Sequence, residues 1–396
     1  MEKERIYFDH AATTPVRREA LEKMLPYFSE VFGNANSQHM FGRDAVKAVD
    51  EARDTVARII NAKPSEIYFT SGGTESDNWA LRGTAHARRD KGRHLIVSSI
   101  EHPAMIATAK QLEKDGFDVT YLPVDETGTV SPESVRNAIR DDTVFIGVMT
   151  ANNEVGTIQP VKEIAAIAKE KKITMFTDAV QAAGVLKLDV KELGVDMMSF
   201  SGHKFYGPKG VGVLYVKSGV KIDPVMTGGH QERMKRGGTT NVPAIVGMAE
   251  AFRLADEERE KNAAYVTALR DRFIAGVEAC IPDVKLNGHR VNRLPANADF
   301  SFRYIEGESI LFHLDLAGIA VSSGSACSSG SLEPSHVLLA MGVPEETAHG
   351  SIRFTFGTDN TAEEVDYAVD VLAETVKKLR AMSPLFKQFE GEKQYV

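Results

Sequence analysis

The sequence has little cysteine, no long apolar run and no internal repeat. Cys280 and Cys327 are the only cysteines among 396 residues and lie far apart in the chain, which excludes a disulfide framework and a cysteine-based metal knuckle. We expect no bound metal. No run approaches the roughly 18 apolar residues of a membrane helix, and the opening Met-Glu-Lys-Glu-Arg leads into a short strand rather than the apolar core of a signal peptide. The sequence therefore predicts a cytoplasmic protein with no membrane partner.

Excess positive charge is also absent. The formal net charge is −8 and the pI is near 5.8, which argues against a nucleic-acid partner. Hydrophobic residues make up 43% of the chain and charged residues 26%, as in an ordinary globular protein. At 396 residues the chain exceeds what one hydrophobic core usually supports, so we expect two domains.

Short apolar runs alternate with helical patterns over the first half of the chain. The runs that read as strands cover residues 67–70, 95–98, 119–122, 144–149, 173–177, 197–200 and 211–216. Such alternation predicts an α/β fold with a mostly parallel sheet and helices on both faces. In that architecture the active residues collect at the carboxyl ends of the strands.

The remaining pattern predicts a smaller α/β domain. A long helical pattern from Pro243 to Cys280 leads to strands at 298–304, 319–322 and 351–356. We place the boundaries at residues 1–14 for an N-terminal segment, 15–257 for a large domain and 258–396 for a small one. The N-terminal segment, with a helix expected over 15–28, should pack near the small domain or over the cleft.

A carboxylate and a lysine stand at the ends of two of these strands. Asp178 ends the run that starts at Ile173, and Lys204 follows the run that starts at Met197. Such a lysine is well placed to form a Schiff base with a carbonyl cofactor, and the aspartate could pair with a pyridinium nitrogen, as pyridoxal phosphate (PLP) requires. Either residue alone is more simply an ordinary strand-end or surface residue. The two together, with the signals below, favour the cofactor site.

A small-residue turn before a helix suggests a phosphate site. Gly73 and Thr74 follow the strand at 67–70, where free N–H groups and the helix dipole favour an anion. Ser201 and His203, beside Lys204, could add contacts. A plain glycine turn capped by Thr74 explains the first pair equally well, and Ser201 and His203 could merely cap a turn.

Three more polar residues follow strand ends. His102 could stack on a flat heteroaromatic ring and, because imidazole titrates near neutrality, could also move protons. Gln181 could bond a phenolic oxygen of the cofactor, and Asn153 lies just beyond the strand at 144–149. A lone histidine is more often structural, and either amide could instead satisfy loop backbone.

Arg353 is a charge inside the apolar run 351–356. A planar guanidinium is the usual bidentate clamp for a carboxylate, so a buried arginine suggests a substrate with an α-carboxylate. An arginine facing outward on an edge strand is an equally good explanation of the spacing.

Cys327 lies in a segment dominated by serine and glycine, residues 322–331. This composition describes an exposed, mobile loop, in which a thiol can visit a pocket and swing away. Such behaviour suits a nucleophile that must carry something off. Cys280, at the end of a helical pattern, is expected to pack in a core.

The assembled residues resemble the cysteine desulfurases of the NifS/IscS type, in the class V branch of fold-type-I PLP enzymes. The resemblance covers nearly the whole chain, from Tyr7 to the final helix. It rests on the motifs SGGTESDN (71–78), SSIEHPA (98–104), ANNEVGTIQP (151–160), TDAVQAAG (177–184), SFSGHKFYGPKGVG (199–212) and SSGSACSSG (322–330). The long Ser/Gly loop looks like the NifS/IscS group rather than the SufS-like group.

The resemblance implies roles for these residues in PLP binding. Lys204 would form the Schiff base, Asp178 would pair with the pyridine nitrogen, and Gln181 would contact the phenolate oxygen. His102 would stack on the ring. The phosphate would be held by Gly73, Thr74, Ser201 and His203, with Asn153 also near the cofactor.

The same resemblance implies a substrate site and a homodimer. Arg353, helped by Asn34 and Asn153, would bind the substrate carboxylate, and Cys327 would attack the substrate sulfur. Thr239 looks like a residue sent into the phosphate site of a second copy. Two stretches depart from the family pattern: Gly33-Asn-Ala-Asn-Ser37, which keeps Asn34, and Gly228-Gly-His-Gln-Glu232, where a third glycine is common.

We therefore expect an enzyme that converts L-cysteine to L-alanine and leaves a persulfide on Cys327. The persulfide would supply an iron–sulfur scaffold protein or another sulfur acceptor. A selenocysteine or cystine lyase and a class V aminotransferase are rivals, although transamination has no use for a loop thiol. A catalytically silent protein that only binds an iron–sulfur scaffold is a rival of another class, and the intact Lys204, Asp178 and Cys327 argue against it.

Overall fold

The apolar runs of the first half of the chain form one seven-stranded sheet in the computed structural model, which describes residues 5–323 and 333–393. The strands lie in the order β2-β8-β7-β6-β5-β3-β4. Their bounds are β2 Ile67–Thr70, β3 His94–Ser98, β4 Asp118–Leu122, β5 Thr143–Gly147, β6 Thr174–Asp178, β7 Met197–Ser201 and β8 Gly212–Val216.

Only β8 runs against the other strands of this sheet. β8 pairs antiparallel with both of its neighbours, whereas the pairs β3–β4, β3–β5, β5–β6 and β6–β7 are parallel. The predicted mostly parallel sheet is therefore confirmed. The carboxyl ends of six strands meet at one edge, because β2 also runs in the direction of β7.

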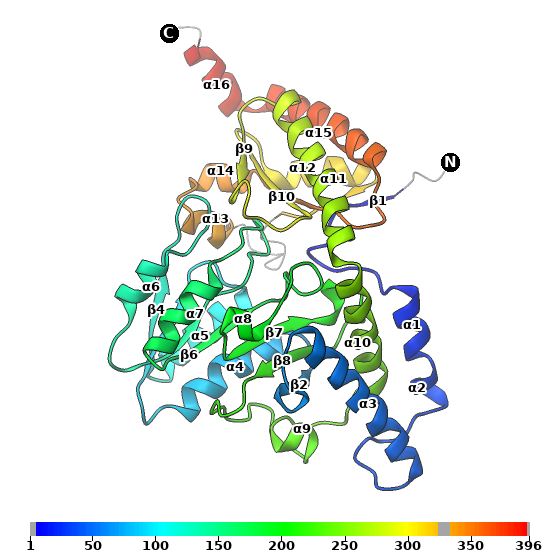
Figure 1. Ribbon diagram of the computed structural model, residues 1–396. Helices are drawn as coiled ribbons and strands as arrows, with labels where there is room; N and C mark the ends of the chain where they lie inside the picture. The colour runs from blue at the N-terminus through cyan, green and yellow to red at the C-terminus, as the bar shows by residue number, and fades with distance from the viewer. Residues whose placement is uncertain (1–4, 324–332, 394–396) are drawn as a thin grey trace.

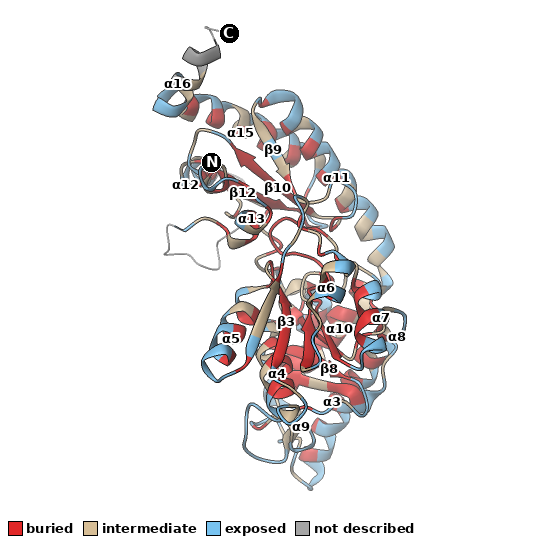
Figure 2. Ribbon diagram, turned by 90° about the vertical axis from the view of Figure 1, so that its left-hand side faces the viewer, coloured by how far each residue is buried: buried red, intermediate tan, exposed pale blue. Residues whose placement is uncertain are grey.

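Helices cover both faces of the sheet, and alternate strand residues enter two apolar clusters. Ile96, Ile146 and Met198 belong to one cluster, whereas Val97 and Phe145 belong to the other. The first is covered by α3 Met40–Ile59, α6 Pro132–Ala138, α7 Val161–Glu170, α8 Val190–Leu193 and α10 Val242–Glu257. The second is covered by α4 Gly73–Ala87 and α5 Pro103–Lys114. Figure 2 shows the strands buried between outward-facing, exposed helix surfaces.

A smaller half lies beside this sheet, with its own apolar cluster (Figure 1). Its three-stranded sheet has the order β12-β10-β9 and is antiparallel. The elements are α11 Arg259–Cys280, β9 Val284–Asn287, β10 Asn297–Phe302, α12 Gly307–Leu316, β11 Ile319–Ala320, α13 His336–Ala340, α14 Glu345–His349, β12 Ser351–Thr355, α15 Ala362–Met382 and α16 Pro384–Lys393.

The N-terminal segment joins the smaller half. β1, Ile6–Tyr7, pairs parallel with β11, and Ile6 and Phe8 lie in the apolar cluster of the smaller half. α10 contributes to the core of the large sheet and α11 to that of the smaller half. We therefore propose that the boundary between the large and the small domain lies near residue 258.

Three local expectations were wrong. The helical pattern over 243–280 forms two helices, which are separated by the single residue Glu258 between the end of α10 and the start of α11. The helix expected over 15–28 divides into α1 Arg18–Met24 and α2 Pro26–Ser29, since Pro26 has no N–H to continue α1. Cys280 is exposed rather than packed, because Ile281 beside it takes the buried position.

Among residues 5–323 and 333–393, no helix has both the length and the apolarity needed to cross a membrane. The short helix α9, Gln231–Met234, follows β8 on a long connection that lies below the large sheet in Figure 1.

Candidate active site

A cavity of about 590 Å³ lies where the parallel strands of the large sheet end. It is lined by ten of the residues predicted for the site: Gly73, Thr74, His102, Asn153, Asp178, Gln181, Ser201, His203, Lys204 and Arg353. Nine of them follow or end strands of the large sheet, and Arg353 comes from β12 of the smaller half. The fold thus brings together residues that are far apart in sequence.

Lys204 ends a short 3-10 turn, Gly202–Lys204, that follows β7 directly. Its Nζ donates hydrogen bonds to the carbonyl oxygens of Ala11 and Ala12, at 2.5 and 2.8 Å. The N-terminal segment therefore passes across the strand ends and forms part of the cavity wall. No sequence pattern indicates this contact, because its acceptors are backbone atoms of small residues.

Asp178 is the last residue of β6 and is buried. Its Oδ1 accepts a hydrogen bond from the N–H of Val180 at 2.8 Å. Burial raises the pKa of Asp178 to about 6, although that hydrogen bond and the charge of Lys204 both lower it. A cation in the cavity would favour the ionised form further.

A second buried carboxyl, Asp77 of α4, lies on the same face of the sheet. Ser199 is the register partner of Asp178, and its Oγ donates to Asp77 Oδ1 at 2.6 Å. Burial, and then the charge of Asp178, raise the pKa of Asp77 well above its usual range. Asp77 is therefore harder to ionise than an ordinary aspartate. Asp77 was not among the predicted site residues. The available sequence signal was its position about one helical turn after Gly73, which places both residues on the same face of α4.

His102 caps the amino end of α5. Its Nδ1 accepts from the N–H of Ala104 at 3.1 Å, so the ring proton lies on Nε2. Burial, followed by the charges of Lys204 and His336, lowers the pKa of His102 to about 4. The ring is therefore neutral at physiological pH and can lie against a flat aromatic ring without adding charge.

Glu101, next to His102, is a buried carboxyl that joins two strand ends. Its Oε1 accepts from Ser98 Oγ at 2.6 Å and from the N–H of Met149 at 2.7 Å, whereas Oε2 has no partner among the described residues. Burial raises the pKa of Glu101 from its ordinary value of 4.5 to about 8, against the effect of both hydrogen bonds. Glu101 is therefore protonated at neutral pH.

This protonation predicts a pH dependence of stability. Between pH 4.5 and about 8 the folded chain holds a proton on Glu101 that the unfolded chain has lost, so the free energy of unfolding falls as the pH rises through this window. Glu101→Gln keeps the acceptor Oε1 but cannot ionise. We compare the unfolding temperatures of the PLP-free proteins at pH 5 and pH 8. The unfolding temperature of Glu101→Gln minus that of wild type should be larger at pH 8 than at pH 5.

The exposed Glu163 of α7 supplies the control, because Glu163→Gln removes a carboxylate of the same size from the surface. It should follow the wild-type pH dependence. If Glu101→Gln and wild type show the same change in unfolding temperature between pH 5 and 8, Glu101 is not the proton-holding group.

The amino end of α4 provides the expected phosphate end of the cavity. Gly73 is its first residue, and a Cβ there would lie 2.7 Å from Val180 Cγ2, so a side chain would displace the wall. Gly72 before it has φ 153°, which L side chains rarely adopt. α4 has 15 residues, long enough for its free N–H groups and dipole to favour an anion.

Ser201 and His203 line the same cavity from β7 and the turn after it. His203 Nδ1 lies 3.2 Å from Thr13 Oγ1, and its carbonyl accepts from Thr14 Oγ1 at 2.9 Å. Burial and the nearby lysines, Lys204 first, lower the pKa of His203 to about 4. Gln181 Nε2 donates to the carbonyl of Ala11 at 3.0 Å, so it too contacts the N-terminal segment.

Arg353 faces inward, which resolves the ambiguity of its spacing. Its side chain is buried, its Nη1 donates to the carbonyl of Asn153 at 2.8 Å, and its Nη2 contacts Asp9 Oδ1 at 3.0 Å. Its Nε is buried without a hydrogen-bond partner among the described residues. A buried guanidinium donor without an acceptor at a cavity wall suits an incoming carboxylate.

Two predicted site residues, Asn34 and Thr239, are described but are not among the residues that line this cavity. Asn34 is exposed between α2 and α3, where its Oδ1 accepts from the N–H of Asn36. Thr239 is exposed and lines a separate hollow with Arg236, which is paired with Glu75 of α4 at 2.7 Å. Cys327 lies outside the described residues.

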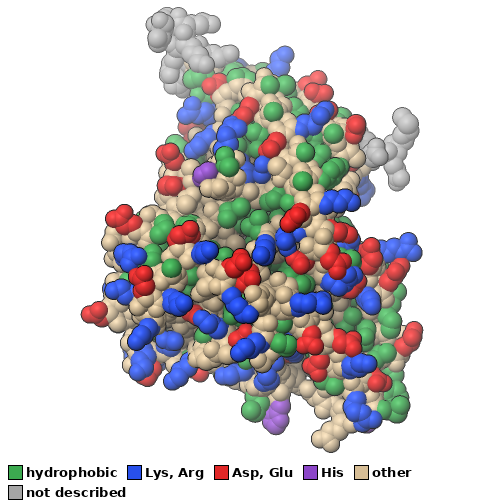
Figure 3. Space-filling model, in the orientation of Figure 1, with side chains coloured by type: hydrophobic (Ala, Val, Ile, Leu, Met, Phe, Trp, Pro, Cys, Tyr) green, Lys and Arg blue, Asp and Glu red, His purple; other side chains and the backbone are tan. Residues whose placement is uncertain are grey.

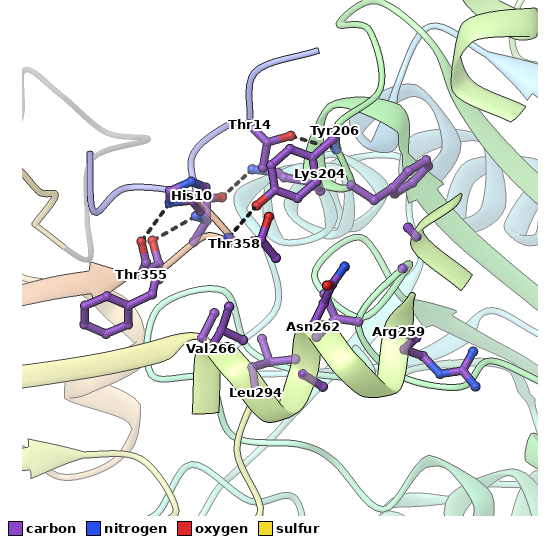
Figure 4. A pocket seen from close by; sticks show the side chains of 18 of the residues that line it. His10, Thr14, Lys204, Tyr206, Arg259, Asn262, Val266, Leu294, Thr355 and Thr358 are labelled. Atoms are coloured by element: carbon purple, nitrogen blue, oxygen red, sulfur yellow. Dashed lines mark hydrogen bonds between the residues drawn. The ribbon is translucent and has the colours of Figure 1, made fainter. Parts of the chain in front are cut away.

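A second cavity of about 240 Å³ lies behind Lys204 (Figure 4). Lys204 and Tyr206 lie on one wall, and Asn262 and Val266 of α11 lie on the other. It shares Ala11, Gln181 and Lys204 with the first cavity but lacks the other predicted site residues. The converging polar groups therefore identify the first cavity as the candidate active site.

Over the described part of the chain, no three His, Cys, Asp or Glu side chains gather in a way that could hold a metal ion.

Comparisons with known proteins agree on one family. Residues 6–368 match the model of the family described as aminotransferase class-V. A cysteine desulfurase IscS of Dictyoglomus turgidum is 54% identical over 99% of this chain and 99% of its own length. A cysteine desulfurase IscS of Methanosarcina thermophila is 56% identical over 97% of this chain and 95% of its own. A solved NifS-like protein has a TM-score of 0.90 and 40% identity, and the match covers 95% of this chain and all of that one.

Proposed function

The chain belongs to the aminotransferase class-V family, and from this membership and the site geometry we propose that it is a PLP-dependent cysteine desulfurase that converts L-cysteine to L-alanine. The resemblance found in the sequence is thereby confirmed at the level of the family. The observation that carries the proposal is the convergence of Lys204, Asp178, His102 and Arg353 on one cavity.

PLP is the cofactor of this family, and the residues at the cavity fit it. Lys204 offers an amine, Asp178 a carboxylate for the ring nitrogen, and the amino end of α4 a cradle that a Cβ at Gly73 would fill. When bound, PLP supplies an electron sink for negative charge at the substrate Cα. We propose that Gln181, Ser201, His203 and Thr74 contact its polar groups.

The chain's own residues then orient the substrate and move protons. We propose that Arg353 binds the substrate carboxylate through its buried Nε, beside the Asn153 loop that already holds its Nη1. Lys204 Nζ, once released, would take the proton from Cα. His102, held neutral with its proton on Nε2, would lie against the cofactor ring and can donate that proton.

The overall reaction joins the Cys327 thiol and L-cysteine to give a Cys327 persulfide and L-alanine. A bond forms between the two sulfur atoms, and the substrate bond between Cβ and sulfur breaks with its electron pair staying on carbon. A proton replaces sulfur on Cβ. The transferred sulfur is oxidised and Cβ is reduced, so no outside oxidant is needed.

The rival activities explain fewer residues. A class V aminotransferase could use the same cavity but has no role for a thiol in the segment that holds Cys327. A silent scaffold-binding protein would not need Lys204, Asp178 and Arg353 at one cavity. A lyase acting on selenocysteine or cystine stays the alternative closest to this proposal.

We also propose a homodimer. Large apolar side chains are exposed along α1, α2 and the start of α3, and Figure 3 shows hydrophobic side chains on that edge of the molecule. Phe28 and Phe32 are 62% and 63% exposed, which is unusual for a monomer surface. Thr239, on an exposed loop, would then reach the phosphate site of the second copy. A cytoplasmic location and an iron–sulfur scaffold protein or other sulfur acceptor as partner stay predictions.

The test is mass spectrometry of the purified protein after two treatments. Borohydride should fix a pyridoxyl group to Lys204, and L-cysteine should add the mass of one sulfur atom to the peptide that carries Cys327, with alanine released. Alanine without added sulfur on Cys327 would point to a lyase without persulfide transfer. A pyridoxyl group on another lysine would overturn the assignment of Lys204.

A further inference from the structure

A hollow of about 300 Å³ lies at the amino edge of the large sheet, opposite the candidate active site. Among its lining residues, Thr174 begins β6, Asp196 precedes β7, and Lys217 follows β8, which is antiparallel and ends where β7 begins. Arg88 follows α4, the helix whose amino end lines the active site. Because α4 has 15 residues at about 1.5 Å each, the hollow lies roughly 20 Å from that site.

The charged side chains of this hollow are mostly basic. Those that line it, among the described residues, are Arg88, Lys169, Lys172, Lys217 and Asp196. Asp196 is already compensated, because its Oδ1 lies 3.1 Å from Lys217 Nζ and its Oδ2 accepts from the N–H of Met175 at 3.2 Å. Within residues 5–323 and 333–393, Arg88, Lys169 and Lys172 form no ion pair with a carboxylate. Three positive charges at the hollow are thus unmatched.

Two buried polar atoms at the hollow have no hydrogen-bond partner in the described part of the chain. Thr174 is 2% exposed and its Oγ1 has no partner, and the Nε atom of Arg88 is in the same situation. Alternation along β6 places Thr174 on the side of Phe176, which packs in the cluster covered by α4 and α5. The hydroxyl is therefore on the side of the sheet where α4 ends. Both atoms can donate, so together they suit an anion that offers several acceptor oxygens.

We propose that this hollow binds a phosphate group, either as inorganic phosphate or as the phosphoryl group of a small monoester. Such a group carries a charge of roughly −1.5 to −2 near pH 7 and three strong acceptor oxygens. Thr174 Oγ1 and Arg88 Nε would donate hydrogen bonds to it, and Lys169 and Lys172 would offset its charge. The proposed function assigns no role to these residues, so the inference goes beyond it.

A rival explanation assigns the basic residues to the helices. Arg88 and Lys169 lie at the carboxyl ends of α4 and α7, where a cation offsets the helix dipole. That account requires neither the buried hydroxyl of Thr174 nor the hollow itself. It predicts no bound anion, so a binding measurement separates the two explanations.

The test is calorimetric titration of the PLP-bound protein at constant ionic strength, with inorganic phosphate in one arm and glycerol 3-phosphate in the other. The cofactor's own phosphate is proposed to occupy the amino end of α4, so added phosphate reports on other sites. We expect saturable binding of at least one compound and none of acetate. Tighter binding of glycerol 3-phosphate would identify a monoester as the ligand, and tighter binding of phosphate would identify the inorganic ion. The affinity should fall as salt is raised, because exposed charges are screened.

Two pairs of neighbouring residues supply variants with matched controls. Arg88→Gln should weaken phosphate binding about tenfold, the usual effect of losing one hydrogen bond to a charged group. Arg89→Gln is its control, because Arg89 is exposed and does not line the hollow. Lys172→Gln should weaken binding several-fold, whereas Lys171→Gln, at an exposed residue outside the hollow, should change the affinity by less than about twofold.

Thr174→Val tests the buried hydroxyl, because valine keeps its shape. A buried hydroxyl without a partner destabilises the fold, so the variant should unfold at a higher temperature than wild type in phosphate-free buffer. The same variant should bind phosphate about tenfold more weakly. A hydroxyl with a purely structural role would leave the phosphate affinity unchanged, and that result would contradict the role of Thr174.

Two outcomes overturn the inference. In the first, neither phosphate compound shows saturable binding to wild type. In the second, binding occurs but Arg88→Gln and Arg89→Gln weaken it equally, which would mean that phosphate only screens a basic surface. Neither outcome bears on the proposed function, which is decided by whether wild type makes alanine from L-cysteine.

Discussion

Asp178→Asn is expected to cut the turnover of L-cysteine by about two to three orders of magnitude, the usual effect of losing one preorganised electrostatic partner of a transition state. Asparagine keeps the size of the side chain and an oxygen that can accept from the N–H of Val180. It cannot carry the negative charge that keeps a pyridine nitrogen protonated. The ring would then be a poorer electron sink, because charge developing at Cα is no longer drawn to a cationic nitrogen.

The measurement is kcat with L-cysteine, together with the visible absorption of bound PLP. Binding of the cofactor should persist, since the contacts expected at the amino end of α4 do not involve Asp178. The comparison of the two readouts separates a loss of chemistry from a loss of cofactor.

Asp77→Asn is the matched control for this charge. Asp77 lies on the same side of the sheet and is also a buried aspartate, but burial and the charge of Asp178 raise the pKa of Asp77 well above its usual range and so favour its neutral form. Asparagine resembles that neutral acid, so we expect only a few-fold loss. Near-normal turnover in Asp178→Asn, or an equal loss in both variants, would contradict the division of roles between the two carboxyls.

The strand ends were the most predictable part of the site. Lys204, Asp178 and His102 each follow an apolar run, and the alternation of strands and helices indicated a parallel sheet. Because the carboxyl ends of parallel strands share one edge, the pattern alone placed these three residues near one another. The structure shows them lining one cavity.

Orientation on an edge strand was not predictable. β12 is at the edge of the three-stranded sheet, and alternation permits Arg353 to face either side. What turns it inward is its contact with Asn153 and Asp9, which are 200 and 344 residues away in the chain. Contacts at such separations depend on the packing of the two halves, and no local pattern contains them.

Buried carboxyls were missed for a related reason. Asp77, Glu101 and Glu154 look like surface residues in the sequence, because acidic side chains are usually exposed. Their burial follows from helices and loops that close over them, and their partners, such as Ser335 for Glu154, lie far away in the chain. The strand β9 was missed because Val284–Asn287 is short and only partly buried, which leaves a weak alternation signal.

Cys327→Ser is expected to abolish persulfide formation while leaving substrate binding in place. Serine keeps the size and polarity of the side chain but lacks the soft sulfur nucleophile that attacks the substrate sulfur. Arg353 and Lys204 are unchanged, so L-cysteine should still bind and alter the visible absorption of the enzyme. No sulfide should be released, and no sulfur should be added to the protein in mass spectra.

Cys280→Ser is the matched control, because Cys280 is the other cysteine of the chain and is exposed at the end of α11. It should keep the wild-type rate and the wild-type persulfide, which would then be assigned to Cys327 by elimination as well as by mass. If Cys327→Ser desulfurates L-cysteine at the wild-type rate, the thiol is not the nucleophile. A lyase that releases sulfur without an enzyme persulfide would then be the better description.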